Sequence, residues 1–344
     1  MLHPNKCYLV DSCRLQNRLY AITVIGIFFL FSFELLGWIP VMPFGTFRWN
    51  RTKSYNRNAS PRPTGSDFSP GSSSTVYDFP FMLRPEQTCS SRNTSFVVAV
   101  TSTPLNFARR RAIRETWGNR QQQRSFNVAV MFLLGTGLDC NVQDQLVSEN
   151  QIHEDLLQGD FIDSYSNLTL KSVMALRWAN NFCPGVKYFM KTDDDIFVNL
   201  PNLVSYLTHK LEPTHSWIVG CIKNHVGQPV MIKAAKAVYD FHPSLPSPHP
   251  PFVAGAGYVI SGKAIGDLYS TAVRTRYLSV EDAFITGHCA RKIGLFPEHD
   301  DRFSCGEAVT SVCKMINKFT GHKVTPSKQK DIWKKLKDLS CEYN

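Results

Sequence analysis

The chain has 344 residues, of which 43% are hydrophobic and 12% aromatic, so a full globular core is expected and disorder is excluded for most of it. Lys and Arg number 38 against 28 Asp and Glu, a formal net charge of +10 that favours phosphate-bearing or other anionic partners. No nucleic-acid-binding motif accompanies this charge, so nucleic acid is not an expected partner.

The first element in chain order is an apolar segment at residues 19–39, which reads LYAITVIGIFFLFSFELLGWI. A membrane-spanning helix needs ~20 such residues, and no small-residue cleavage site of a signal peptide follows. A buried core helix is the alternative. Because Arg14 and Arg18 lie closest to the segment, we expect a cytoplasmic tail at residues 1–18 and a transmembrane signal-anchor at residues 19–39.

Residues 40–90 are rich in Ser, Pro, Gly, Asn and Arg, which predicts a flexible lumenal stem. Four glycosylation acceptor patterns follow the apolar segment and agree with a lumenal location: Asn50, Asn58, Asn93 and Asn167. The eight cysteines after that segment form no close CxxC pair, so we expect disulfides of undefined connectivity, with no structural zinc.

The remaining residues, 91–344, are expected to form one catalytic domain in which strands and helices alternate. The apolar patterns predict strands at 96–100, 128–134 and 187–190, and helices at 109–117, 142–157 and 168–181. This alternation predicts an α/β domain with a largely parallel sheet and a ligand beyond the carboxyl ends of its strands. A basic C-terminal helix, Lys328 to Lys337, is expected either to pack on the domain or to touch a membrane surface.

Three consecutive carboxylates, Asp193, Asp194 and Asp195, follow the strand at 187–190. Like charges this close repel one another, and a divalent cation with oxygen ligands would compensate them. Alternate residues of a strand face the same way, so Asp193 and Asp195 are the candidate ligands. A solvated turn with a capping Asp is the alternative.

Arg110 and Arg114 lie four residues apart, so on a helix they share one face. Together they could hold a diphosphate, because guanidinium groups suit bidentate phosphate contacts. On spacing alone, a surface helix with solvated arginines explains the pattern better.

Paired carboxylates, Glu281 and Asp282, could supply a general base, although Ser279 and Asp282 also fit a helix-capping box. Gly255 and Gly257 lie in a run of small residues that would let the backbone approach a ligand closely, or simply pack a tight turn.

The order and spacing of these motifs resemble the beta-1,3-galactosyltransferase family, glycosyltransferase family 31. The matching stretches are RRAIRETWG from Arg110, KTDDDIFVN from Lys191, GAGYVISG from Gly255 and EDAFITG from Glu281. Ala256 and Ala283 depart from the usual pattern of that family, which affects the expected pocket shape more than the chemistry.

The resemblance implies a Rossmann-like fold of the GT-A type, a UDP-sugar donor, Mn²⁺ and inversion at the anomeric carbon. Asp193 and Asp195 would hold the metal, His299 would be a third ligand, and Asp282 would be the base. The residues that would bind the donor are Arg110, Arg114, Lys191, Asp194, Gly255, Gly257 and Glu281.

The expected function is therefore beta-1,3 transfer of a hexose from a UDP-sugar to an acceptor glycan on glycolipid or glycoprotein, with galactose as the favoured hexose. The expected location is the Golgi membrane, in type II orientation. An N-acetylhexosamine donor is the near alternative. A membrane-anchored glycan-binding protein without catalysis, with Asp193 and Asp195 on calcium, is a more distant one. A glycoside hydrolase using Glu281 and Asp282 is disfavoured, because adjacent helical residues point about 100° apart.

Overall fold

The computed structural model describes residues 76–86, 88–89, 94–210, 214–223 and 249–338. The expected tail, the signal-anchor and most of the stem lie outside these residues. Within the described part, no helix is long and apolar enough to cross a membrane. The described elements belong to one compact unit, residues 74–344.

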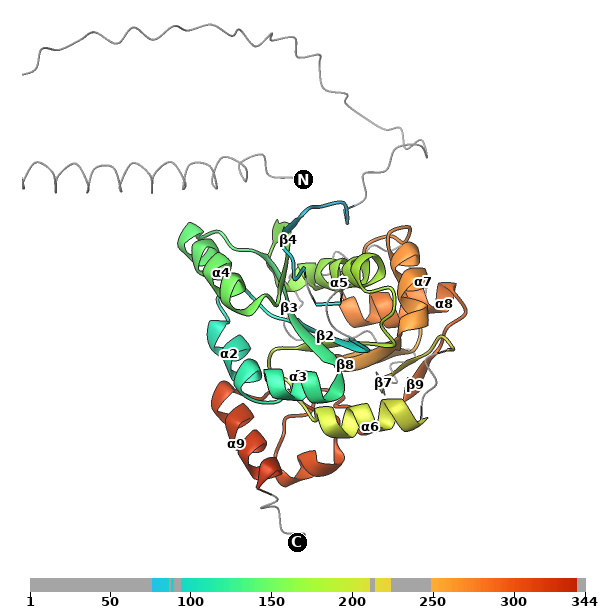
Figure 1. The fold of residues 1–344 in the computed structure, drawn as a ribbon. Helices are drawn as coiled ribbons and strands as arrows, with labels where there is room; N and C mark the ends of the chain where they lie inside the picture. The colour runs from blue at the N-terminus through green and yellow to red at the C-terminus, as the bar shows by residue number, and fades with distance from the viewer. Residues whose placement is uncertain (1–75, 87, 90–93, 211–213, 224–248, 339–344) are drawn as a thin grey trace, which may run out of the picture. The chain divides into compact units, whose positions relative to one another are not determined.

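A mixed sheet of eight strands forms the centre of this unit, in the order β1-β4-β3-β2-β5-β8-β7-β9 (Figure 1). Six strands run parallel and only β1 and β8 run antiparallel to them. The bounds are β1 Phe81–Leu83, β2 Phe96–Thr101, β3 Val128–Thr136, β4 Leu156–Ile162, β5 Tyr188–Asp193, β7 Ile218–Lys223, β8 Phe252–Ser261 and β9 Pro297–His299. A small second sheet pairs β6 Phe197–Val198 with β10 Thr320–Gly321.

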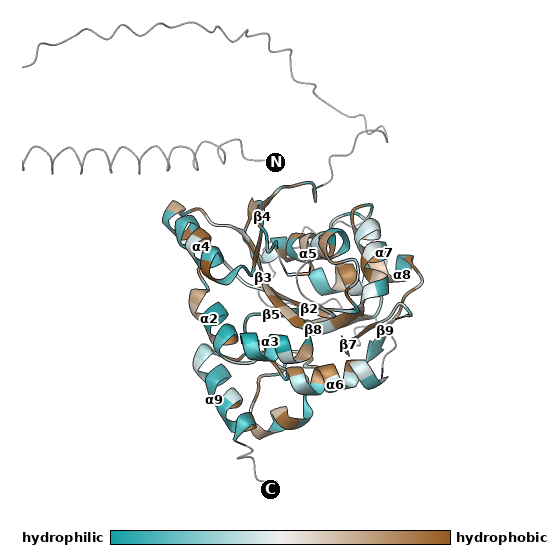
Figure 2. Cartoon of the chain, viewed as in Figure 1, coloured by the Kyte–Doolittle hydropathy of each residue, from teal (hydrophilic) through white to brown (hydrophobic). Residues whose placement is uncertain are grey.

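Helices cover both faces of the sheet, which explains why its strands are apolar on both sides. In β2 the side chains of Val97 and Ala99 join one core cluster, while those of Val98 and Val100 join the other. One face carries α2 Phe107–Glu115, α3 Arg120–Phe126, α4 Cys140–His153, α6 Leu200–Lys210 and α9 Pro326–Lys337. The opposite face carries α5 Leu168–Phe182, α7 Gly262–Ala272, the π-helix Ala283–Cys289 and α8 Ala290–Lys292. Figure 2 shows the apolar strands at the centre, with polar residues along the helices.

Two sequence expectations need revision. The helix expected at 142–157 ends at His153, because Glu154 adopts a left-handed conformation, and Leu156 begins β4 instead. The last residues expected as stem, from Tyr77 to Cys89, pack on the domain: Tyr77 is buried and β1 pairs with β4. The C-terminal helix packs on the domain through the buried Ile332, which was one of the two options for it.

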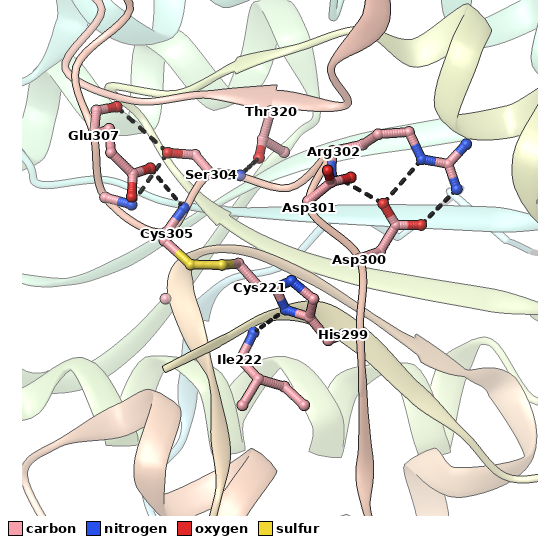
Figure 3. The surroundings of a disulfide bond; sticks show 12 residues. Cys221, Ile222, His299, Asp300, Asp301, Arg302, Ser304, Cys305, Glu307 and Thr320 are labelled. Carbon is pink, nitrogen blue, oxygen red and sulfur yellow. Dashed lines mark hydrogen bonds and ion pairs between the residues drawn. A yellow bond between two sulfur atoms is a disulfide. The ribbon is translucent and has the colours of Figure 1, made fainter. Parts of the chain in front are cut away.

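Two of the disulfides join cysteines of the described residues that are far apart in the chain. Cys89 pairs with Cys183 at the end of α5, and Cys221 on β7 pairs with Cys305 (Figure 3). The expectation of disulfides is therefore confirmed, and Cys289 is a buried free thiol among the described residues.

Candidate active site

The order in which the chain adds strands to the sheet reverses between β2 and β5. From β2 the chain proceeds outward to β3 and then β4, and β5 returns to the other side of β2. Such a switch point opens a crevice at the carboxyl ends of the two strands, which is where open α/β sheets bind their ligands. The acidic turn Asp193–Asp195 ends β5 at this edge, opposite the loop that follows β2.

Asp194 faces the loop after β2 and fastens it to the turn. Its Oδ2 accepts hydrogen bonds from Ser102 Oγ at 2.7 Å and from Asn106 Nδ2 at 2.8 Å. Arg109 lies 3.8 Å from the other oxygen. Burial raises the pKa of Asp194, although these partners oppose the shift. Asp194 therefore joins the acidic turn to the loop after β2.

Lys191 is the centre of the network behind the turn. Its buried Nζ lies 2.8 Å from Asp193 Oδ1 and 3.0 Å from Glu281 Oε2, and donates to the Gly255 carbonyl at 3.1 Å. Burial opposes the charge of Lys191, but the two carboxylates prevail and raise its pKa. Since an ammonium has three protons and three protein oxygens surround it, this side chain is engaged by the protein itself.

Glu281 is equally enclosed, with only 4% of its surface exposed. Its Oε1 accepts from Tyr258 Oη at 2.6 Å and from Ser172 Oγ at 2.8 Å, while Oε2 faces Lys191. Burial raises the pKa of Glu281, and Lys191 counters that effect. Both carboxylate oxygens contact other side chains of the protein, so Glu281 holds Lys191 in place.

Asp282 stands between β8 and the π-helix that begins after it. Its Oδ2 accepts from the Gly255 amide and its Oδ1 from the Ala283 amide, both at 2.9 Å. Gly255 also serves Lys191, because its carbonyl accepts a hydrogen bond from Lys191 Nζ. The acidic turn and Asp282 are therefore held in one network through the backbone of a single residue, Gly255.

Asp195 meets a histidine that sequence reasoning missed. Its Oδ2 lies 3.7 Å from Nε2 of His322, and both side chains are partly exposed. Nδ1 of His322 lies 2.7 Å from the Gly306 carbonyl, which can only accept, so the tautomer of the neutral imidazole that fits this contact has its proton on Nδ1 and its lone pair on Nε2. A carboxylate beside such an imidazole is a suitable oxygen–nitrogen donor pair for a divalent metal. Among the described residues, no group of three or more His, Cys, Asp and Glu could hold a metal.

His299 is not brought to this cluster. It lies on β9, and the strand registers align it through Gly220 and Tyr258 with Lys191, three strands away. At ~4.8 Å per strand this separates the backbones by about 14 Å. Its Nδ1 accepts a hydrogen bond from the Ile222 amide at 3.1 Å, as Figure 3 shows.

Arg110 and Arg114 share a face of α2, as their spacing predicted, but that face meets α4. Arg110 lies 2.7 Å and Arg114 2.6 Å from Glu149, and Arg114 also pairs with Asp155 at 2.7 Å. Arg110 further donates to the Thr103 carbonyl at 2.6 Å, which fixes the loop after β2. Both guanidinium groups are thus engaged by carboxylates of the protein.

Three smaller predictions can also be placed. Gly257 packs against β10, since a Cβ there would lie 2.9 Å from Thr320 Cγ2. A Cβ at Gly255 would make ordinary contacts with Asp282 and Lys191. Asn167 donates from Nδ2 to the Ile162 carbonyl at 2.7 Å, whereas Asn50, Asn58 and Asn93 lie outside the described residues.

The fold and the site define an α/β enzyme with its carboxylates gathered at a switch point. Residues 108–301 match the family model described as Galactosyltransferase. Mouse beta-1,3-galactosyltransferase 1 is 35% identical over 271 residues, which cover 77% of this chain and 82% of the relative. Rat beta-1,3-galactosyltransferase 4 is 34% identical over 272 residues, covering 71% of this chain and 73% of that relative. Mouse lactosylceramide 1,3-N-acetyl-beta-D-glucosaminyltransferase is 32% identical over 295 residues, covering 81% of this chain and 77% of that relative.

The chain therefore belongs to the galactosyltransferase family, and the resemblance of its motifs is confirmed. It is a glycosyltransferase, an enzyme that transfers a sugar to an acceptor glycan.

Proposed function

We propose that this glycosyltransferase is of the GT-A type and moves a hexose from a UDP-sugar to an acceptor hydroxyl, with galactose as the favoured sugar. The transfer inverts the anomeric carbon and forms a beta-1,3 linkage. The observation that carries the proposal is the Lys191 network. It joins Asp193 to Asp282 through Gly255, whose carbonyl accepts from Lys191 and whose amide donates to Asp282. The names of the 35% and 34% identical relatives favour galactose as the donor sugar.

In this mechanism Asp282 takes the proton of the acceptor hydroxyl as that oxygen attacks the anomeric carbon. The new carbon–oxygen bond forms on one face of the sugar while the bond to the UDP phosphate oxygen breaks on the other. The bonding pair leaves with UDP, so an α-linked donor gives a β product. Backbone amides of Gly255 and Ala283 bind the two carboxylate oxygens and fix the direction in which Asp282 accepts the proton.

The residues that would hold Mn²⁺ are Asp195 and His322. Their oxygen and nitrogen atoms fit such an ion, and two protein ligands leave coordination positions for diphosphate oxygens and water. When bound, the metal supplies positive charge where the departing diphosphate gains negative charge. Asp193 is paired with Lys191, so we assign it to orienting the turn.

We also propose that the protein is a type II membrane protein of the Golgi with this domain in the lumen, and that its acceptor is a glycan on glycolipid or glycoprotein. Support comes from the apolar segment at 19–39 and from the acceptor patterns after it. The disulfides agree with this location, because such bonds persist in oxidising compartments.

A donor screen of the purified protein tests the function. UDP-galactose, UDP-N-acetylglucosamine and UDP-N-acetylgalactosamine are each supplied with Mn²⁺ and simple sugar acceptors, and acceptor-dependent UDP release is measured. We expect release with UDP-galactose, its loss in Asp282→Asn, and its retention in Asp267→Asn, a matched change of an exposed carboxylate on α7. Acceptor binding without release from any donor would contradict transfer and favour the glycan-binding alternative.

A further inference from the structure

An exposed aromatic side chain belongs to a short helix that is tied to the segment before Asp282. Tyr165 lies in a short 3-10 helix, Tyr165–Asn167, directly after β4, and 63% of its surface is exposed. Among the described residues its hydroxyl has no hydrogen-bond partner. A single exposed aromatic is ordinary on a protein surface, so its location decides whether it has a function.

The strand pattern places Tyr165 at the edge of the sheet where the acidic turn lies. Because β4 runs parallel to β3, β2 and β5, the residues after β4 and those after β5 emerge at the same edge. The hydroxyl of Tyr277 donates to the Ser166 carbonyl, and Thr169 donates to the Leu278 carbonyl at 2.6 Å. These bonds attach the short helix to the segment that leads directly into Glu281 and Asp282.

The electrostatics of the phenol agree with this position. Partial burial raises the pKa of Tyr165, and the negative charges of Asp282 and then Asp193 raise it further, while Lys191 opposes them. Among the charged groups, Asp282 has the strongest influence on the pKa of this hydroxyl, in agreement with the position that the strand pattern and the two hydrogen bonds give it.

We propose that Tyr165 is an acceptor-binding residue, whose ring packs against the C–H face of the acceptor pyranose next to the hydroxyl that Asp282 deprotonates. This inference rests on the proposed function. Pyranose rings present an apolar face of C–H groups, which an aromatic ring covers with a large contact area. Tyr loses little conformational entropy in such a contact, and the bonds at Ser166 and Thr169 hold its backbone before the sugar arrives.

Kinetics of Tyr165→Ala and Tyr165→Phe test the proposal, with donor and acceptor varied separately. We expect Tyr165→Ala to raise the acceptor KM about tenfold while the donor KM stays within about twofold. Tyr165→Phe keeps the ring and should stay close to wild type. Phe296→Ala is the matched control, because Phe296 is 67% exposed and precedes β9, at the opposite edge of the sheet.

The outcomes separate this inference from the proposed function. If wild type releases UDP with an acceptor but Tyr165→Ala leaves the acceptor KM unchanged, the inference is overturned and the function stands. A rise in the donor KM alone would assign the ring to the donor sugar and would also overturn it. If wild type transfers nothing, the proposed function itself fails. Acceptor affinity is also measured in Asp282→Asn and in the double variant Asp282→Asn with Tyr165→Ala, which are expected not to turn over. Adding Tyr165→Ala should lower this affinity by the same factor as it raises the acceptor KM, and such agreement excludes an effect on turnover.

Discussion

Replacing Lys191 with Met should destabilise the protein mainly through Glu281. The substitution keeps an unbranched stem of similar length but removes the only cation that faces Glu281 among the described residues. Glu281 is 4% exposed, and losing one partner of a buried ion pair costs about 3–5 kcal/mol. Asp193 adds little to this cost, because 35% of its side chain is exposed and water can replace the lysine there.

The matched set for this test is wild type, Lys191→Met, Glu281→Gln and the double variant, with Lys187→Met as an exposed control from the residue before β5. Urea unfolding measures the free energies. We expect the double variant to be more stable than Lys191→Met, because it no longer buries an uncompensated carboxylate. A double variant whose loss equals the sum of the single losses within about 0.5 kcal/mol would refute the ion pair as the cause.

The pH dependence of Lys191→Met provides a second check. Without its cation, Glu281 should have a still higher folded pKa than burial already causes. A carboxyl whose pKa is raised on folding stabilises the protein below its unfolded pKa, and that contribution is lost as the pH rises through the folded pKa. The gap in stability between Lys191→Met and wild type should therefore widen from acid to neutral pH.

Three further changes have defined outcomes. Glu149→Gln should lower the free energy of unfolding by about 2–3 kcal/mol at neutral pH. Burial opposes the charge of Glu149, but its two arginine partners prevail and lower its pKa. The difference in stability between wild type and Glu149→Gln, measured by urea unfolding, should therefore shrink as the pH falls through this lowered pKa. Cys305→Ser removes the disulfide between residues 84 apart in sequence and should lower the free energy of unfolding by about 4–5 kcal/mol. A reduced wild type as stable as the oxidised wild type would contradict this expectation. His322→Ala should raise the Mn²⁺ concentration for half-maximal activity at least about tenfold, whereas His299→Ala should not; the reverse result would restore His299 as the ligand.

Local patterns predicted the elements whose side chains repeat with a clear period. The run at β2 is apolar on both faces and α5 has helical spacing, so both were found within a residue or two of their ends. The failure at β4 has a local cause: Leu156 and Leu157 continue the helical spacing of α4, and only the left-handed Glu154 separates them. The antiparallel insertion of β8 beside β5 depends on pairing between distant segments, which a local pattern does not contain.

The candidate site shows the same division. The acidic turn was found because three carboxylates after an apolar strand are a local signal. The contact between His322 and Asp195 was missed because the two residues are remote in sequence. The arginine pair was expected to hold phosphate because its spacing shows a shared face but not what covers that face, and Glu149 comes from another helix.

Asp282 was given two competing interpretations from sequence, a member of a capping box with Ser279 and a general base. Its side-chain hydrogen bonds come from Gly255 and Ala283 and not from Ser279, so it caps the π-helix in another way, and this cap is compatible with a general base. Each carboxylate oxygen has two acceptor positions, and the amides of Ala283 and Gly255 take one on each oxygen. The bonds that hold Asp282 therefore leave one acceptor position on each oxygen for the proposed proton transfer. In Asp282→Asn the amide nitrogen cannot accept from either backbone group, so capping and proton transfer are disturbed together, and lost turnover alone does not separate them. A measurement of UDP binding does separate them, because the residues that we propose for the metal and the diphosphate, Asp195 and His322, are joined to Asp282 by no hydrogen bond or ion pair in the described part of the chain.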